Sequence, residues 1–170
     1  RQALVKNAPT PVLTGEVHPD DDQHTIIEVN NAFEDVFGYE AEGIIGQDVA
    51  DVVVPDSGSD RHEEFRSRSA AGETVVTEVE RVTADGPRLF LLTIVPFGTD
   101  ETPADGWYAW YTDITERKKR KRRLKAIFNN TYTFVGLLEP DGTLLEANET
   151  ALSFGELDRE DVVGKPIWDT

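Results

Sequence analysis

A short acidic stretch carries residue types that could bind a metal. His18, Asp20–Asp22 and His24 fall within seven consecutive residues. Imidazole nitrogens and carboxylate oxygens are common metal ligands, so this spacing allows a metal site. The same stretch contains Pro19 and Gln23, and it is equally typical of a solvated turn between two strands. The residues alone leave both interpretations open.

The third histidine lies in the stretch Arg61–Phe65, which has the composition of a helix. The pair His62-Glu63 is similar to the phospho-acceptor site of a kinase, but the expected proline is absent and no nucleotide-binding motif follows. The chain has no cysteine. Thiolate metal sites, thiol nucleophiles and flavin chemistry through a cysteinyl adduct are therefore excluded. We predict that this segment is not an enzyme; the rival hypothesis gives His62 or residues 18–24 a catalytic or metal role.

Arg81 is the cation whose position in the sequence points to binding. It lies on the same side of a predicted strand as Val75 and Val79, which should face the core. A buried guanidinium requires an anionic partner. That partner is either an acid on the covering helices, with candidates Asp35, Asp48 and Glu64, or a small anionic ligand.

The overall charge argues against nucleic acid as a partner. The 170 residues include 33 acids and 17 bases, for a net charge of -16. Phosphate backbones are bound by basic faces. No apolar run is long enough to cross a membrane, and no signal peptide is visible, so we expect a cytoplasmic protein. The acid-rich, lysine-poor composition is typical of proteins from salt-loving organisms.

Half of the positive charge is concentrated in one run. Residues 117–125 hold eight of the 17 bases and no acid. Arg and Lys form helices well, Asp113 is a good N-cap, and Glu116 follows at the capping-box spacing, so a helix is predicted over 114–128. It lacks an apolar stripe and should be solvated. We interpret it as a signalling helix between domains; a nucleic-acid contact, an anionic-lipid contact and a plain linker are the alternatives.

Patterning predicts the elements that must position these residues. The β-rich segments are 12–14, 25–29, 74–83, 89–97 and 107–112, and the helical segments are 31–37, 40–44, 48–53 and 59–71. Two strands followed by helices and then three strands predict an α+β fold. Its five-stranded antiparallel sheet should be covered by helices on one face.

The sequence repeats itself at a constant spacing. Glu28 and Asn30 recur as Glu146 and Asn148, 118 residues later. The same offset aligns residues 42, 44–46 and 51 with residues 160, 162–164 and 169. Counterparts of residues 73–114 would fall beyond residue 170. We therefore expect a complete first unit over 1–116, a linker over 117–126 and a truncated second unit over 127–170, all part of a longer protein.

These motifs resemble the PAS domain family of sensory modules. The resemblance rests on residues 28–49, on the hairpin turn Asp85-Gly86 and on the terminal Asp113-Ile114-Thr115. Residues 141–169 match a second time, with a departure at Gly155-Glu156 where the first copy has Phe37-Gly38. The resemblance implies a module that binds a small molecule or forms a homodimer. It also implies signal transfer through Asp113, Ile114 and Thr115 to a downstream domain, such as the histidine kinase of a haloarchaeal-type two-component protein.

The resemblance also implies where a ligand would bind. His62 matches the axial histidine of haem-binding PAS domains, although histidine is frequent there without haem. The candidate pocket residues are Phe33, Phe37, Phe65, Arg81, Phe90, Leu92, Ile94 and Tyr111. The alternative is that the aromatic side chains fill their own core and leave no cavity, so that the domain acts as a dimerisation scaffold.

Overall fold

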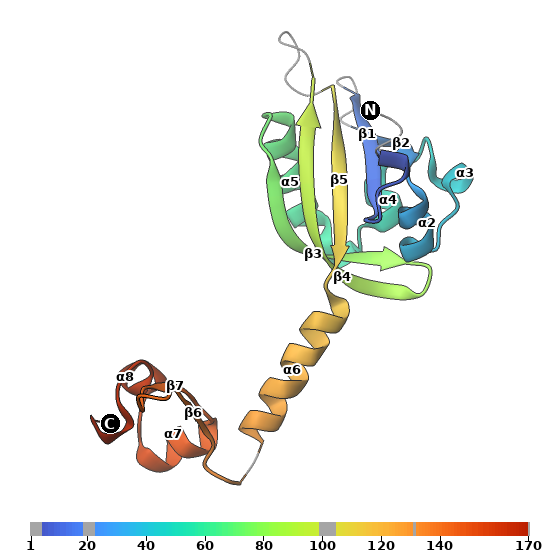
Figure 1. Ribbon diagram of the computed structural model, residues 1–170. Coiled ribbons are helices and arrows are strands. Elements are labelled where there is room, and N and C mark those ends of the chain that lie inside the picture. The colour runs from blue at the N-terminus through green and yellow to red at the C-terminus, as the bar shows by residue number, and fades with distance from the viewer. Residues whose placement is uncertain (1–4, 19–22, 99–104, 131, 170) are drawn as a thin grey trace. The chain divides into compact units, whose positions relative to one another are not determined.

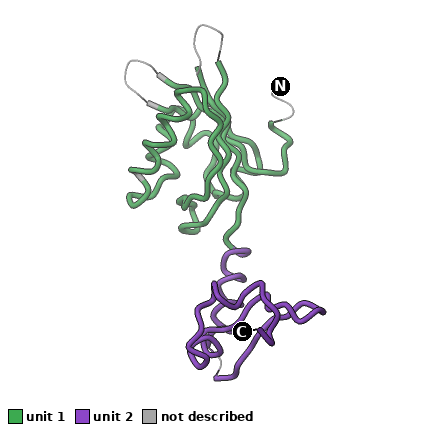
Figure 2. The backbone as a smooth tube through the Cα atoms, turned by 90° about the vertical axis from the view of Figure 1, so that its left-hand side faces the viewer, with its two compact units in different colours: residues 1–115 green, residues 116–170 purple. Residues whose placement is uncertain are grey.

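The computed structural model describes residues 5–18, 23–98, 105–130 and 132–169. The chain divides into two compact units, residues 1–115 and residues 116–170 (Figure 2). Each unit is described by itself. Among the helices that the structure describes, none is both long and apolar enough to cross a membrane.

The first unit is built on the predicted five-stranded antiparallel sheet (Figure 1). Its strands are β1 Val12–His18, β2 Gln23–Val29, β3 Val75–Thr83, β4 Gly86–Phe97 and β5 Gly106–Asp113. Their order in the sheet is β2-β1-β5-β4-β3, so β5 lies between β1 and β4. The fold class is confirmed, and β1 and β4 are longer than predicted.

Helices cover one face of this sheet (Figure 1). They are α2 Asn31–Phe37, α3 Ala41–Ile44, α4 Val49–Val53, the 3-10 turn η1 Asp56–Gly58 and α5 Ser59–Ala70. The side chain of Asn30 accepts a hydrogen bond from the Phe33 N–H and so caps α2. Gly38 ends α2 in the left-handed conformation, at φ 73°.

An aromatic cluster fills the core under α2. The Phe33 and Phe37 rings stack with centroids 4.1 Å apart, and Phe37 stacks on Phe90 at 4.9 Å. The Tyr111 ring meets Phe37 edge to face at 5.1 Å. The Phe33, Phe37, Phe90 and Tyr111 side chains are all buried. This packing accounts for the position of α2 on the sheet.

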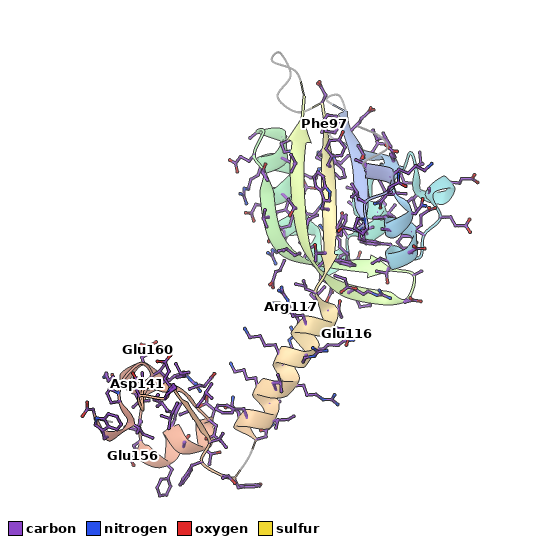
Figure 3. The ribbon with its side chains drawn as sticks, viewed as in Figure 1. Phe97, Glu116, Arg117, Asp141, Glu156 and Glu160 are labelled. Atoms are coloured by element: carbon purple, nitrogen blue, oxygen red, sulfur yellow. The ribbon has the colours of Figure 1, made fainter. Side chains whose placement is uncertain are left out.

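Helix α6, Thr115–Asn129, follows β5 without a break. The predicted helix is confirmed and begins one residue later than expected. None of its residues is buried, and its side chains project around it; Glu116 and Arg117 mark its first turn (Figure 3). The expected capping box does not form: Asp113 accepts from the Thr115 N–H at 2.8 Å, and the Glu116 carboxylate pairs with Lys119 at 3.1 Å.

The second unit repeats the first half of the first unit. It contains β6 Gly136–Leu138, β7 Leu144–Ala147, α7 Glu149–Gly155, α8 Arg159–Val162 and the 3-10 turn η2 Ile167–Asp169. Helices α7 and α8 match α2 and α3 at the 118-residue offset of the sequence. An isolated bridge pairs Thr25 with Asp48, and its counterpart pairs Thr143 with Pro166. The sequence repeat is therefore also a repeat of backbone pairing.

Candidate functional site

A small cavity lies inside the first unit, between the helices and the sheet. The volume open to the centre of a water molecule is about 20 Å³, enough for about one water. Its wall is formed by His24, Val49, His62, Phe65, Arg66, Ser69, Arg81, Leu92, Ile94, Trp107, Ala109 and Tyr111. Among these described residues there are two arginines and two histidines but no carboxylate. The wall is therefore apolar with a cationic side.

Local geometry explains why these residues meet. His62, Phe65, Arg66 and Ser69 recur at the helical spacing of three and four residues, so one face of α5 turns toward the cavity. On the sheet, side chains alternate between the two faces, and strand register brings the inward ones together. Leu92 on β4 pairs with Tyr111 on β5, and the pair formed by residues 94 and 109 lies beside it.

Arg81 is buried at the cavity wall, with only 3% of its surface exposed. Its Nη1 donates to the carbonyl of Glu80 at 3.1 Å. Its Nε is buried and has no hydrogen-bond partner among the described residues. The charge of Arg81 also acts on the neighbouring phenol of Tyr111: burial raises the Tyr111 pKa, and the guanidinium opposes that rise.

The acids proposed as partners of Arg81 lie elsewhere. Asp35 and Glu64 are exposed on the outer sides of their helices. The Asp48 carboxylate accepts hydrogen bonds from the backbone N–H groups of Ala50 at 2.8 Å and His24 at 3.0 Å. In the described part of the chain, no acid forms an ion pair with Arg81. An anionic ligand as the partner of Arg81 stays a prediction.

His62 is a buried neutral imidazole. Its pKa is lowered from 6.5 to about 4, chiefly by burial and also by the positive charges of Arg81 and Arg66. Its Nε2 has no hydrogen-bond partner among the described residues. At neutral pH this imidazole therefore presents a polar ring nitrogen that the surrounding protein leaves unused.

Trp107 lines the cavity from β5. Its indole packs directly over Gly15 on β1, where an added Cβ would lie 2.3 Å from a ring carbon. The ring also stacks on His24, with centroids 5.9 Å apart. The indole Nε1 is buried and has no hydrogen-bond partner within the described residues. Gly15 is thus required for the position of Trp107, because any side chain there would displace the indole.

A second cavity of about 120 Å³ shares part of this wall. Phe65 and Arg81 line both cavities, so these two side chains separate them. The second cavity is bordered by Pro55, Ser57, Gly58 and Arg61 at the start of α5, and by Val79 and Glu80 on β3. The guanidinium of Arg61 lies over the Phe65 ring at 5.7 Å.

The structure divides the eight predicted pocket residues into two groups. Phe65, Arg81, Leu92, Ile94 and Tyr111 line the small cavity. Phe33, Phe37 and Phe90 do not, because their rings stack on one another. Sequence reasoning missed Arg66 and Ser69, which the helical spacing from His62 and Phe65 would have revealed. It also missed Trp107, which shares strand parity with Tyr111.

The other candidate sites have different outcomes. His62 does line the cavity, but about 20 Å³ is far below the roughly 300–1,000 Å³ of sites for drug-sized ligands, so a haem does not fit this space.

Residues 19–22 of the acidic stretch lie outside the described residues. Among the residues described, no group of three or more His, Asp or Glu is arranged to hold a metal ion.

The predicted signal-transfer residues join α6 to the sheet. The Thr115 hydroxyl accepts from the Leu89 N–H at 2.9 Å and donates to the Leu89 carbonyl at 3.3 Å. The Ile114 N–H donates to the same carbonyl at 2.9 Å, and the Ile114 side chain is buried. Asp113 accepts from the Thr115 N–H at 2.8 Å and lies 3.5 Å from Arg88. The first turn of α6 is thereby fixed to β4.

Comparison with known families agrees with this architecture. The family pattern described as the PAS fold matches residues 8–119, and the pattern described as the PAS domain matches residues 131–170. The fold is that of a small α+β sensory domain. The chain belongs to the PAS domain family.

Several relatives are histidine kinases. The cell-division control histidine kinase PdhS of Brucella suis is 27% identical over 170 residues, covering 96% of this chain and 16% of that protein. The sensor histidine kinase TmoS of Ectopseudomonas mendocina is 43% identical over 44 residues, covering 26% of this chain and 4% of that protein. An uncharacterized protein of Azorhizobium caulinodans is 31% identical over 73% of this chain and 17% of its own length. The chain thus spans less than a fifth of each of these relatives.

Solved structures show the same fold. A PAS domain of a protein from Colwellia psychrerythraea has a TM-score of 0.59 at 22% identity, covering 69% of this chain and 96% of that one. An RNA-binding light-oxygen-voltage receptor has a TM-score of 0.61 at 21% identity, covering 74% of this chain and 35% of that one. At these identities the likeness concerns the fold.

Proposed function

We propose that this chain is the sensory part of a signalling protein. In this proposal, a change in the cavity of the first unit passes through β5 and helix α6 to the second unit and on to an output domain. The output domain would be a histidine kinase. The names of the relatives PdhS and TmoS support this class of output.

One observation carries the proposal: the strand that lines the cavity leads directly into α6. Trp107, Ala109 and Tyr111 of β5 form part of the cavity wall, and α6 begins at Thr115. A shift of β5 relative to β4 would act on the hydrogen bonds between Thr115 and Leu89. The start of α6 would then move or fray, because those bonds fix its first turn.

The other end of α6 is fixed in the second unit. The Asn148 side chain donates to the carbonyl of Phe128, in the last turn of α6, at 3.0 Å. The Glu149 N–H at the start of α7 donates to the Asn129 side chain at 3.3 Å. Helix α6 is therefore hydrogen-bonded at its beginning to β4 and at its end to the α7 cap. A displacement at one end can reach the other.

The test uses the full-length protein that contains this chain. Thr115→Val removes both hydroxyl hydrogen bonds and keeps the size of the side chain. Thr112→Val is the matched control, because Thr112 is exposed near the end of β5. We expect Thr115→Val to change the basal autophosphorylation rate several-fold and Thr112→Val to leave it unchanged. Equal rates in all three proteins would contradict the relay through α6.

A homodimer remains a second proposal, and one surface feature favours it. Phe97, Tyr108 and Trp110 form an aromatic ladder of half-buried side chains on β4 and β5, with ring centroids 4.7 Å and 5.7 Å apart. The cavity is lined by the opposite parity of β5, so the ladder is on the outer face of the sheet. Aromatic surface of this kind is enriched at protein interfaces. Trp110→Lys should shift the sedimentation coefficient from dimer to monomer.

A further inference from the structure

The interior cavity contains hydrogen-bond donors that the protein does not satisfy. Arg81 Nε and Trp107 Nε1 are buried donors without a partner among the described residues, and His62 Nε2 is unpaired in the same way. All three side chains belong to the cavity wall and are more than nine-tenths buried. Buried polar groups in native structures are nearly always hydrogen-bonded, so these three unused groups around one space indicate a missing partner, which for the Arg81 and Trp107 donors is an acceptor.

The charges around the cavity indicate that the missing partner is an anion. Arg81 and Arg66 both line this space, and after burial their positive charges are the main causes that lower the pKa of His62. Arg66 has an ion pair with Glu63 at 3.1 Å. Arg81 has none within the described chain and keeps one buried N–H unused. A buried guanidinium is stable only with an anion beside it.

The size of the cavity and its apolar wall residues restrict the class of ligand further. A cavity of about 20 Å³, with room for about one water, admits only the smallest carboxylates, so formate should fit best. Val49, Phe65, Leu92 and Ile94 give it an apolar side opposite the donors. A planar carboxylate matches the fork of a guanidinium, and a short hydrocarbon end matches an apolar wall.

We propose that this cavity binds a small monocarboxylate anion, with Arg81 as its ionic partner and Trp107 and His62 as further hydrogen-bonding groups. A carboxylate ligand would be the signal in the proposed sensory function, and only this biological role rests on that proposal. Binding itself is a property of the first unit and can be measured without any output domain.

The direct test is a titration of the 170-residue chain with sodium formate, sodium acetate and sodium propionate at constant ionic strength. Sodium chloride is the comparison salt. We expect saturable heat of binding with at least one carboxylate up to about 50 mM, as suits ligands of few atoms. No saturable binding by any of the three acids would overturn the proposal. Equal binding of chloride would overturn the carboxylate class.

Variants locate the site. Arg81→Leu should weaken carboxylate binding roughly 100-fold, since a charge-assisted pair is lost. Arg88→Leu is the matched control, because Arg88 is opposite Arg81 in the register of β3 and β4 and pairs with Asp85 and Asp113 outside the cavity. It should bind as the wild type does. Unchanged binding in Arg81→Leu would overturn the assignment.

Stability measurements distinguish a variant that has lost binding from one that fails to fold. Arg81 has no described acid partner, so Arg81→Leu should be as stable as the wild type or more so without ligand. Should Arg81→Leu unfold instead, the inference that Arg81 lacks a protein partner is overturned. Trp107→Phe then tests the site separately, because it removes one donor and keeps an aromatic ring. It should weaken binding several-fold.

The His62 imidazole supplies an independent readout. The groups that act on it are His24 from β2, Arg66 from α5, Arg81 from β3 and Asp48 before α4. A bound carboxylate adds negative charge to this set, so it should raise the His62 pKa from about 4 toward its ordinary value of 6.5. Imidazole NMR signals recorded against pH, with and without acetate, measure this. An unchanged His62 pKa with acetate bound elsewhere would contradict the proposed site.

Discussion

At the scale of single residues, the buried polar side chains divide into satisfied and unsatisfied ones. The Asn30 amide is fully used: its oxygen accepts from the Val12 and Phe33 N–H groups, each at 2.9 Å. Its nitrogen donates to the carbonyls of Val5, Ala8 and Thr10. Arg81 keeps an unused N–H. The first arrangement is structural, and the second is what a ligand site requires.

Asn30→Ala should destabilise the first unit by about 3 kcal/mol, because several buried backbone groups lose their partner at once. Asn31→Ala is the matched control, since Asn31 is exposed at the next position, and it should cost less than about 0.5 kcal/mol. Urea denaturation of the chain measures both changes in the free energy of unfolding. Similar values for the two variants would contradict the role of the Asn30 network.

His62 should make the first unit sensitive to acid. Its pKa is about 4 in the folded chain and 6.5 in the unfolded chain, so the unfolded state takes up a proton first as the pH falls. Stability is therefore lost between pH 6.5 and 4 and not above pH 6.5.

The His62 contribution over that range is roughly 3 kcal/mol. His62→Gln removes this titrating group, so the variant should not lose that stability. The free energy of unfolding of the variant minus that of the wild type should therefore become more positive as the pH is lowered from 7. Denaturation series at several pH values would show this. A difference that stays constant with pH would contradict a buried neutral His62.

At the scale of elements, the two copies end the same helix with different residues. Helix α2 ends at Gly38 with φ 73°, and α7 ends at Glu156 with φ 51°. Glu156 is the non-glycine residue with positive φ in the described chain. A side chain in the left-handed region carries a steric cost that glycine does not. The departure at Gly155-Glu156 therefore leaves α7 with a strained cap.

Glu156→Gly should stabilise the second unit by about 1 kcal/mol, because the left-handed cap becomes unstrained. The reverse change, Gly38→Ala, should destabilise the first unit. There the added Cβ would lie 2.8 Å from the Cβ of Ala84. The backbone at position 38 would also have to keep its positive φ of 73° with a side chain attached. Thermal unfolding followed by circular dichroism compares both variants with the wild type. A loss of stability in Glu156→Gly would argue against strain at this cap.

At the scale of the whole molecule, the two units differ in how much core they bury. The core of the first unit contains 15 buried apolar residues, whereas that of the second contains Leu144, Ala147, Leu152 and Val162. The second unit also exposes large side chains such as Phe154 and Trp168. Hydrophobic burial is the main stabilising contribution, so the two units should open with different free energies.

Hydrogen exchange of the 170-residue chain should show this difference directly. Amides of β3, β4 and β5 should exchange most slowly, and those of β6, β7 and α7 should exchange faster by several orders of magnitude, because local opening costs less there. A monomer with equal protection in both units would contradict the expectation. Protection of the second unit that rises with protein concentration would instead show that its exposed apolar side chains pair between chains.

Much of the fold could be predicted from the sequence, because its signals are local. Strand alternation placed Arg81 on the buried face, helical spacing placed Phe33 and Phe37 on the core side of α2, and the basic run predicted α6. The 118-residue repeat predicted a second copy of the unit, and the structure adds that the copies share an Asn cap and a backbone bridge. Each of these depends on neighbours within a few turns or on a comparison of the chain with itself.

The site itself was decided by tertiary structure. Parity shows that an aromatic ring points inward, but not whether it meets another ring, as Phe37 does, or a cavity, as Phe65 does. Long-range strand pairing puts Gly15 beneath Trp107 and gives that indole its place. Whether Arg81 has an acid partner likewise depends on the separate backbone contacts that occupy Asp48. These outcomes depend on distances between segments far apart in the chain, which local propensity does not determine.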